Sequence, residues 1–179
     1  MGAGGLRGGI EMKFELDFLD KIQMKRTPFL DKAMPVVSNS VALYPLVDFI
    51  LLTNKKTRRD GLIMAVSLTM SAMESNFILK NLFKRARPYM QRSHIKILDK
   101  MPTDFSFPSA HTSVAFSGAA AVHYAGNSTL SKILYAQAAL IAFSRQYLYV
   151  HYPTDIAGGA VFGQFCGWLG MKLVDAGRK

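Results

Sequence analysis

Long apolar blocks separated by short polar segments dominate the sequence. Five of these blocks carry at most one Asp, Glu, Lys or Arg each: residues 33–53, 61–79, 108–126, 133–150 and 156–171. Each block is close to the roughly 20 apolar residues that a helix needs to cross a bilayer. A soluble bundle of this size, the alternative reading, rarely needs every helix to be apolar all round. The pattern therefore predicts an all-α fold, a multi-pass transmembrane helical bundle of about five spans.

The segment before the first block has a different pattern. Phe14, Phe18 and Ile22 recur at four-residue spacing among acidic and basic side chains. Such an amphipathic helix is too charged to span a bilayer and is typical of a helix lying in the membrane interface, although a helix packed on the end of the bundle has the same pattern. We therefore divide the chain into three regions: a glycine-rich flexible leader or cloning remnant at 1–13, an interfacial amphipathic helix at 14–30, and a transmembrane helical bundle at 31–176 with an extracytoplasmic loop at 84–107.

Composition and charge narrow the range of partners. The 179 residues suit one domain, and Lys and Arg (22) exceed Asp and Glu (12), for a net charge of +10. The basic residues are spread among the loops that flank the apolar blocks, so anionic lipid is the expected partner and nucleic acid is not. The dense basic turn at 54–60 is typical of a cytoplasmic loop. The loop at 84–107 carries six Lys and Arg against four in this turn, so charge counting decides the orientation only if the excess in that loop binds phosphate. The single Cys166 gives no information about the compartment.

Three polar clusters stand at the ends of these blocks: Lys80 with Arg87, Ser109 to His111, and Arg145 with His151 and Asp155. If each block crosses the membrane once, all three clusters fall on the same side. Ionisable groups at the edge of an apolar environment are costly unless they bind or react with something. A helix continued past Lys80 would place Arg87 on the same face, seven residues on. We expect the clusters to form one site.

These residue types suit phosphate chemistry. Arginine and lysine bind phosphate oxygens, and Pro108 in a first helical turn would leave the N–H groups of Ser109, Ala110 and His111 free for an anion. The sequence has no evident cluster of metal ligands, so we expect protein side chains to supply the positive charge, with no cofactor. One histidine would attack phosphorus while the other transfers a proton, and Asp155 would fix the tautomer of His151.

Other polar or small residues have simpler interpretations. Gly159, Gly163 and Gly167 recur at four-residue spacing, which predicts a close helix-packing face. Asp48 and Glu74 lie within apolar blocks, where a structural role is favoured over a functional one, and we expect His94 and His123 to be loop or core residues.

The three clusters together resemble the signature motifs of the type 2 phosphatidic-acid phosphatase superfamily, which also includes the vanadium haloperoxidases. The resemblance rests on Lys80 with six residues before Arg87 and Pro88, on the run Pro108 to His111, and on Ser144 and Arg145 followed by His151 and Asp155. The helix layout extends it over residues 33–175. The sequence departs from the family at Ala110, where glycine is usual, and we expect alanine to be tolerated because that position supplies a backbone amide.

This resemblance implies a function and roles for particular residues. It implies an integral-membrane, metal-independent lipid phosphatase of the cell membrane, with its site on the extracytoplasmic side. His151 would be the nucleophile that forms a phosphohistidine, Asp155 its orienter and His111 the acid for the leaving group. The implied phosphate-binding residues are Lys80, Arg87, Ser109, Ala110 and Arg145. We favour undecaprenyl pyrophosphate as substrate, because the basic loop offers charge for more than one phosphate, over phosphatidylglycerophosphate, phosphatidate or lipid A. A vanadate-dependent haloperoxidase and a non-catalytic lipid binder are remoter alternatives.

Overall fold

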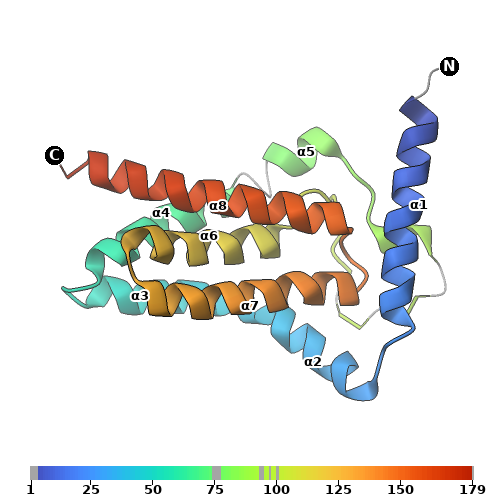
Figure 1. Ribbon diagram of the computed structural model, residues 1–179, viewed down its shortest axis with the longest axis horizontal. Helices are drawn as coiled ribbons and strands as arrows, with labels where there is room; N and C mark the ends of the chain where they lie inside the picture. The colour runs from blue at the N-terminus through green and yellow to red at the C-terminus, as the bar shows by residue number, and fades with distance from the viewer. Residues whose placement is uncertain (1–3, 74–77, 93–94, 97, 100, 179) are drawn as a thin grey trace.

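The computed structural model describes residues 4–73, 78–92, 95–96, 98–99 and 101–178, which are helices and loops without a β-strand in these ranges. The long helices lie alongside one another as a bundle, and the N-terminal helix crosses one end of it (Figure 1). The α-helices are α1 (Gly4–Gln23), α2 (Pro28–Asn39), α3 (Tyr44–Thr53), α4 (Arg58–Met73), α5 (Lys80–Phe83), α6 (Ala110–Ala125), α7 (Ser128–Tyr147) and α8 (Pro153–Ala176), and the short 3-10 helices are η1 (Ser40–Leu43) and η3 (Pro88–Gln91).

Helix α1 lies across one end of the bundle (Figure 1) and begins at Gly4, ten residues earlier than predicted. Its inner face carries Leu16 and Leu19, which are buried against Tyr149 and Tyr152, while Phe14 is 75% exposed and Phe18 42% exposed. Of the three residues at four-residue spacing, Phe14 and Phe18 thus lie on the outer face, whereas Ile22 packs against the inner cluster. Packing on the bundle end, the alternative interpretation, describes its inner face, and the exposed aromatic side chains leave an apolar surface suited to an interface.

The first apolar block is a bent helical stretch. The side chain of Thr27 caps α2 by accepting a hydrogen bond from the Leu30 amide at 3.2 Å, so the stretch begins at Pro28, five residues before the predicted start. Four residues of η1 separate α2 from α3. Within the described part of the chain, Pro28–Thr53 is the one helical stretch that is long and apolar enough by itself to cross a membrane. The prediction of about five spans is therefore not confirmed by length and composition.

The second block corresponds to α4 and does not continue as one helix to Arg87. Lys84 adopts the left-handed conformation, with φ of 46°, and ends α5 after Phe83. Arg87 then lies in extended backbone. The prediction that Lys80 and Arg87 share a helix face is therefore wrong, although both side chains reach the same cavity. Glu74 lies outside the described residues.

Helix α6 is the centre of the bundle and packs against α4, α7 and α8. The glycines of α8 make the closest of these approaches. A Cβ at Gly163 would lie 2.4 Å from the Ser113 carbonyl oxygen, and one at Gly167 would lie 2.4 Å from the Ala120 Cβ. Gly159 faces the Ser109 carbonyl oxygen in the same way, at 2.7 Å. The predicted packing face is confirmed, and it brings the start of α8 next to the start of α6.

The side chains are distributed as in a protein surrounded by apolar solvent. Large apolar side chains are exposed along the outside of three helices: Phe49 and Ile50 on α3, Ile133 and Leu140 on α7, and Val161, Phe165 and Trp168 on α8. Serine hydroxyls are buried between α4 and α6, where Ser71 and Ser113 are hydrogen-bonded at 2.7 Å. An apolar exterior over several helices is typical of a surface that contacts another apolar phase.

The remaining predicted spans match single helices with shifted ends. Helix α6 corresponds to 108–126, α7 to 133–150 and α8 to 156–171, but α7 ends at Tyr147 and α8 continues to Ala176. The five residues between α7 and α8 are a compact loop that carries His151. At the other end of α8, Arg59 forms a two-pronged ion pair with Asp175, at 2.8 and 3.0 Å, which ties α4 to α8 far from that loop.

Candidate active site

All the predicted site residues except Ser109 and Asp155 line a cavity of about 300 Å³ at the end of the bundle that α1 crosses. Lys80, Arg87, Arg145 and the two histidines His111 and His151 all line it, and so does Ala110. Its remaining lining comes from apolar side chains and from the loop before α6: Val41, Pro45, Pro102, Asp104 and Val114. The cavity thus has a cationic end and an apolar wall formed by the η1–α3 segment and α6.

Three cations surround the polar end of this cavity, and each is almost fully buried. Asp104 pairs with two of them, because one carboxylate oxygen accepts a hydrogen bond from Lys80 Nζ and the other from Arg87 Nη2 at 2.6 Å. Although partial burial acts in the opposite direction, these hydrogen bonds lower the pKa of Asp104 to about 2. A carboxylate therefore lies between two cations in the way that a phosphate oxygen pair would.

Arg145 is the third cation. Its Nη1 donates to Ser38 Oγ at 2.5 Å, while its Nε is buried without a hydrogen-bond partner. A buried donor without an acceptor is costly, so an anionic or polar ligand that accepts a hydrogen bond from Arg145 Nε would be stabilised here. The cation stands in the last turn of α7, where the negative end of the helix dipole favours positive charge.

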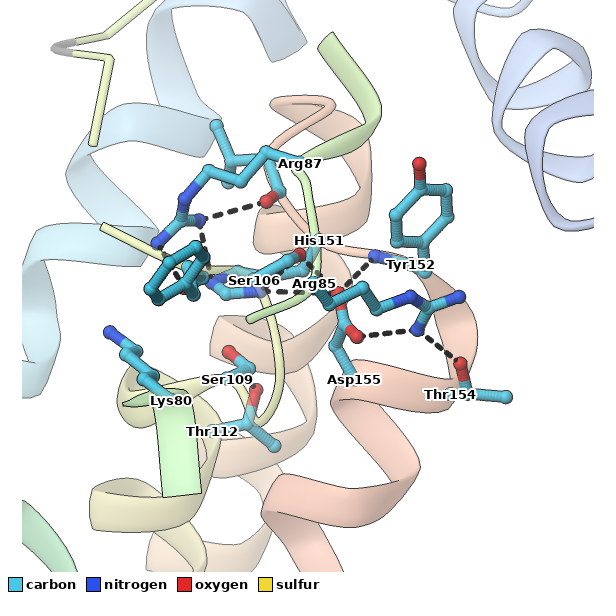
Figure 2. A network of polar contacts seen from close by, with 12 residues as sticks. Lys80, Arg85, Arg87, Ser106, Ser109, Thr112, His151, Tyr152, Thr154 and Asp155 are labelled. Atoms are coloured by element: carbon cyan, nitrogen blue, oxygen red, sulfur yellow. Dashed lines mark hydrogen bonds and ion pairs between the residues drawn. The ribbon is translucent and has the colours of Figure 1, made fainter. Parts of the chain in front are cut away.

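The imidazole of His151 is held between an arginine and a carboxylate (Figure 2). Its Nε2 lies 3.2 Å from Arg87 Nη1, and its Nδ1 lies 3.5 Å from Asp155 Oδ2. Arginine has donors only, so Nε2 is the acceptor and the ring proton belongs on Nδ1. Burial also lowers the pKa of His151 to about 3, which keeps the ring neutral. This tautomer leaves Nε2 unprotonated, as a nucleophile requires.

Asp155 is fully buried in the first turn of α8, and its two oxygens have different partners. Oδ2 accepts hydrogen bonds from the Tyr152 amide at 2.8 Å and from Ser106 Oγ, and it faces His151. Oδ1 accepts a hydrogen bond from Arg85 Nη1 at 2.6 Å. The predicted pairing of Asp155 with His151 is present, and the 3.5 Å separation leaves room for it to tighten when a ligand binds.

The start of α6 differs in detail from the prediction. The helix begins at Ala110 with Ser109 as its N-cap, so Pro108 precedes the first turn. The Ser109 amide donates to the Asp155 carbonyl oxygen at 3.1 Å and is not free for an anion. The Ser109 hydroxyl is buried and accepts a hydrogen bond from Thr112 at 3.0 Å (Figure 2). Ala110 and His111 do line the cavity, so the helix start still faces it.

The polar residues that we expected to be structural lie away from the cavity or outside the described residues. His123 is exposed at the end of α6, and Asp48 has one buried oxygen without a partner on α3, away from the cavity lining. His94 lies outside the described residues.

Sequence reasoning missed Asp104, Ser106 and Arg85. The available signal was position, because Asp104 and Ser106 directly precede the second motif and Arg85 lies within the first.

Comparison with known proteins agrees with this geometry. A sequence profile described as the PAP2 superfamily matches residues 60–179. The chain belongs to the PAP2 superfamily. The match takes in α4 to α8 and so contains both histidines, all three cations and Asp155. The family resemblance drawn from the three motifs is thereby confirmed.

Individual PAP2 relatives cover most of the chain at low identity. An undecaprenyl-diphosphatase of Sulfolobus acidocaldarius is 26% identical over 131 residues, which are 73% of this chain and 63% of that protein. LpxE of Aquifex aeolicus has a TM-score of 0.76 at 25% identity, covering 88% of this chain and 94% of that one. A transmembrane PAP2-type phosphatidylglycerolphosphate phosphatase from Bacillus subtilis has a TM-score of 0.73 at 22% identity, covering 97% and 88%.

These similarities support a phosphatase and a membrane setting for this PAP2 protein. They also confirm the all-α class, because the fold is shared with a transmembrane relative over nearly the whole chain. The relatives carry different substrate names at similar distances from this chain.

Proposed function

We propose that this PAP2 protein is an integral-membrane lipid phosphatase that hydrolyses a lipid phosphate or pyrophosphate through a phosphohistidine on His151. Undecaprenyl pyrophosphate is the substrate that we favour, ahead of phosphatidylglycerophosphate, phosphatidate and lipid A. The observation that carries the proposal is the meeting of His111 and His151 with three buried cations in one cavity. Such a set binds phosphoryl oxygens and contains both a nucleophile and a proton donor.

Each step of the proposed reaction has a group in the cavity. The phosphoryl oxygens bind Lys80, Arg87 and Arg145. His151 Nε2 forms a bond to phosphorus as the bond from phosphorus to the leaving oxygen breaks, and His111 gives that oxygen its proton. The imidazole then carries positive charge, which Asp155 stabilises through Nδ1–H. A water molecule that gives a proton back to His111 attacks phosphorus, the P–N bond breaks, and phosphate leaves.

The shape of the cavity and the surface of the protein favour a lipid. The wall opposite the cations is apolar, formed by Val41, Pro45 and Val114, so an amphiphile can place its phosphate and the start of its chain in one cavity. The exposed apolar side chains along α3, α7 and α8 suit a multi-pass protein. Such an apolar surface agrees less well with a haloperoxidase that works in water. The basic turn at 54–60 lies at the opposite end of the bundle, so a cytoplasmic turn would place the site on the extracytoplasmic side.

Release of inorganic phosphate by purified protein in detergent tests this function. We expect turnover of undecaprenyl pyrophosphate in the presence of EDTA, because the cavity supplies positive charge from its own side chains. His151→Ala should abolish release and His111→Ala should slow it strongly, since the leaving group then lacks its acid. Trapping of a 32P label on the wild type but not on His151→Ala would identify the intermediate.

The same assay separates the alternatives. Parallel turnover of undecaprenyl pyrophosphate, phosphatidylglycerophosphate, phosphatidate and lipid A ranks the substrates, and equal rates would refute the preference for the first. A non-catalytic lipid binder would release no phosphate from any of them. Halide oxidation in the presence of vanadate and peroxide, with no phosphate release, would favour the haloperoxidase.

A further inference from the structure

Arg85 is not one of the motif residues and has no part in the proposed reaction steps, but its side chain makes several contacts beside the site. Its Nη1 donates to Asp155 Oδ1 and to Thr154 Oγ1, each at 2.6 Å, and its Nη2 forms an ion pair with Glu15 on α1. The guanidinium also lies 4.0 Å from the centroid of the Tyr152 ring, in a cation–π arrangement. Figure 2 shows the guanidinium on the side of Asp155 away from His151.

The two oxygens of Asp155 are divided between two tasks. Oδ2 faces His151, and Oδ1 is taken by Arg85. A carboxylate rotates about one bond, so fixing Oδ1 also fixes the direction in which Oδ2 points. Arg85 therefore sets the orientation of the oxygen that holds the nucleophile in its reactive tautomer.

Arg85 also supplies charge. Asp155 is fully buried, and among the described ion pairs its permanently charged partner is Arg85, because His151 is charged only when protonated. A buried carboxylate without a cation is strongly disfavoured. Arg85 thus keeps Asp155 ionised while His151 stays neutral, so the carboxylate is ready to stabilise the positive charge that develops on the imidazole.

Glu15 fixes Arg85 in turn, from a helix that lies outside the family match. Glu15 is buried, and its Oε1 accepts hydrogen bonds from the Thr154 amide at 2.9 Å and the Thr154 hydroxyl at 2.6 Å. Its other oxygen pairs with Arg85. Because Leu16 and Leu19 anchor the same turns of α1 on Tyr149 and Tyr152, Glu15 is held in one place above the start of α8.

We propose that Arg85 is a positioning residue for the His151–Asp155 pair and that Glu15 of α1 holds it in place, so that α1 completes the active site. This inference rests on the proposed function, since it concerns the same nucleophile. Neither residue lines the cavity. Both therefore act on the rate of the chemical step through Asp155 and not on phosphate binding.

The test compares Arg85→Gln with Arg92→Gln in the full-length protein. Arg92 is the matched control, because it also anchors α1, through Asp20 at 3.2 Å and Asp17 at 3.8 Å, but none of these contacts involves Asp155. We expect Arg85→Gln to lower kcat for undecaprenyl pyrophosphate about tenfold, the effect of losing a hydrogen bond between charged groups. KM and the inhibition constant of inorganic phosphate should stay at the wild-type values, and Arg92→Gln should keep the wild-type kcat.

Two further variants separate positioning from folding. Arg85→Lys restores the charge, so it should recover part of the lost kcat, and Glu15→Gln should lower kcat about threefold while phosphate inhibition is unchanged. Wild-type kcat in Arg85→Gln would overturn this inference alone. Equal losses in Arg85→Gln and Arg92→Gln, or loss of phosphate inhibition together with kcat, would show a merely structural role. No phosphate release by the wild type would overturn the proposed function and this inference with it.

Discussion

Replacing Asp104 by asparagine should strengthen the binding of phosphate. The Asp104 carboxylate pairs with Lys80 and Arg87 inside the cavity, so an incoming phosphate must compete with it for the same donors. A pKa of about 2 in place of 3.8 corresponds to about 2 kcal/mol of preference for the ionised carboxylate. Because the Asp104 side chain is 47% exposed, solvent screening reduces its net interaction free energy with the two cations to about 1 kcal/mol. Asp104→Asn should therefore bind phosphate about fivefold more tightly.

The assay is the inhibition constant of inorganic phosphate, measured alongside KM between pH 5 and 8. Asp104 stays ionised throughout this range, since its pKa is about 2, so the ratio between variant and wild type should not change with pH. Asp60→Asn is a charge-matched control, because Asp60 lies at the start of α4, at the other end of the bundle. Weaker phosphate binding in Asp104→Asn would refute the reasoning, because it would mean that the carboxylate orders the two cations for the substrate.

Three other predictions concern the support of the site and the packing of the bundle. Ser106→Ala removes a donor to Asp155 Oδ2 and should lower kcat about tenfold with little change in KM, as steady-state kinetics will show; an unchanged kcat would mean that the remaining donors suffice. Gly163→Ala forces a Cβ against the Ser113 carbonyl oxygen and should cost about 2 kcal/mol, seen as a lower Tm in detergent, whereas Gly177→Ala, with its nearest atom at 3.7 Å, should leave Tm unchanged. Arg59→Gln breaks a solvent-screened ion pair and should lower Tm by less than Gly163→Ala does in the same measurement.

The motifs predicted which residues form the cavity, but not the backbone conformation that brings them together. Spacing placed Lys80, Arg87, Arg145 and the histidines at one end of the bundle, and the structure brings them to one cavity. The turn at Lys84 was not predicted, because a helical period gives no information on where a loop begins. The groups that surround Asp155 were also missed. Glu15 and Arg85 are 70 residues apart, and single charged side chains in amphipathic or basic segments carry no signal for such a contact.

The helices were easier to place than their surroundings. Long apolar blocks and the glycine spacing predicted α6, α7 and α8 to within a few residues, because helix packing in an apolar setting depends on small residues at a regular interval. The amphipathic pattern at the N-terminus identified α1 as a helix but did not show which of its residues cover the bundle end. Leu16 and Leu19 are as apolar as Phe14 and Phe18, and only the position of Tyr149 and Tyr152 decides which pair is covered.

The cationic end and the apolar wall of the cavity come from different parts of the chain. Every group that we propose to react or to bind phosphate lies within residues 60–179, whereas Val41 and Pro45 of the apolar wall precede that region. Changes in η1 and α3 can therefore reshape the space for a lipid chain while the proposed phosphoryl-transfer groups, fixed by the glycine seam between α6 and α8, stay as they are. This division gives a physical basis for one catalytic apparatus to process lipids that differ in everything except their phosphate.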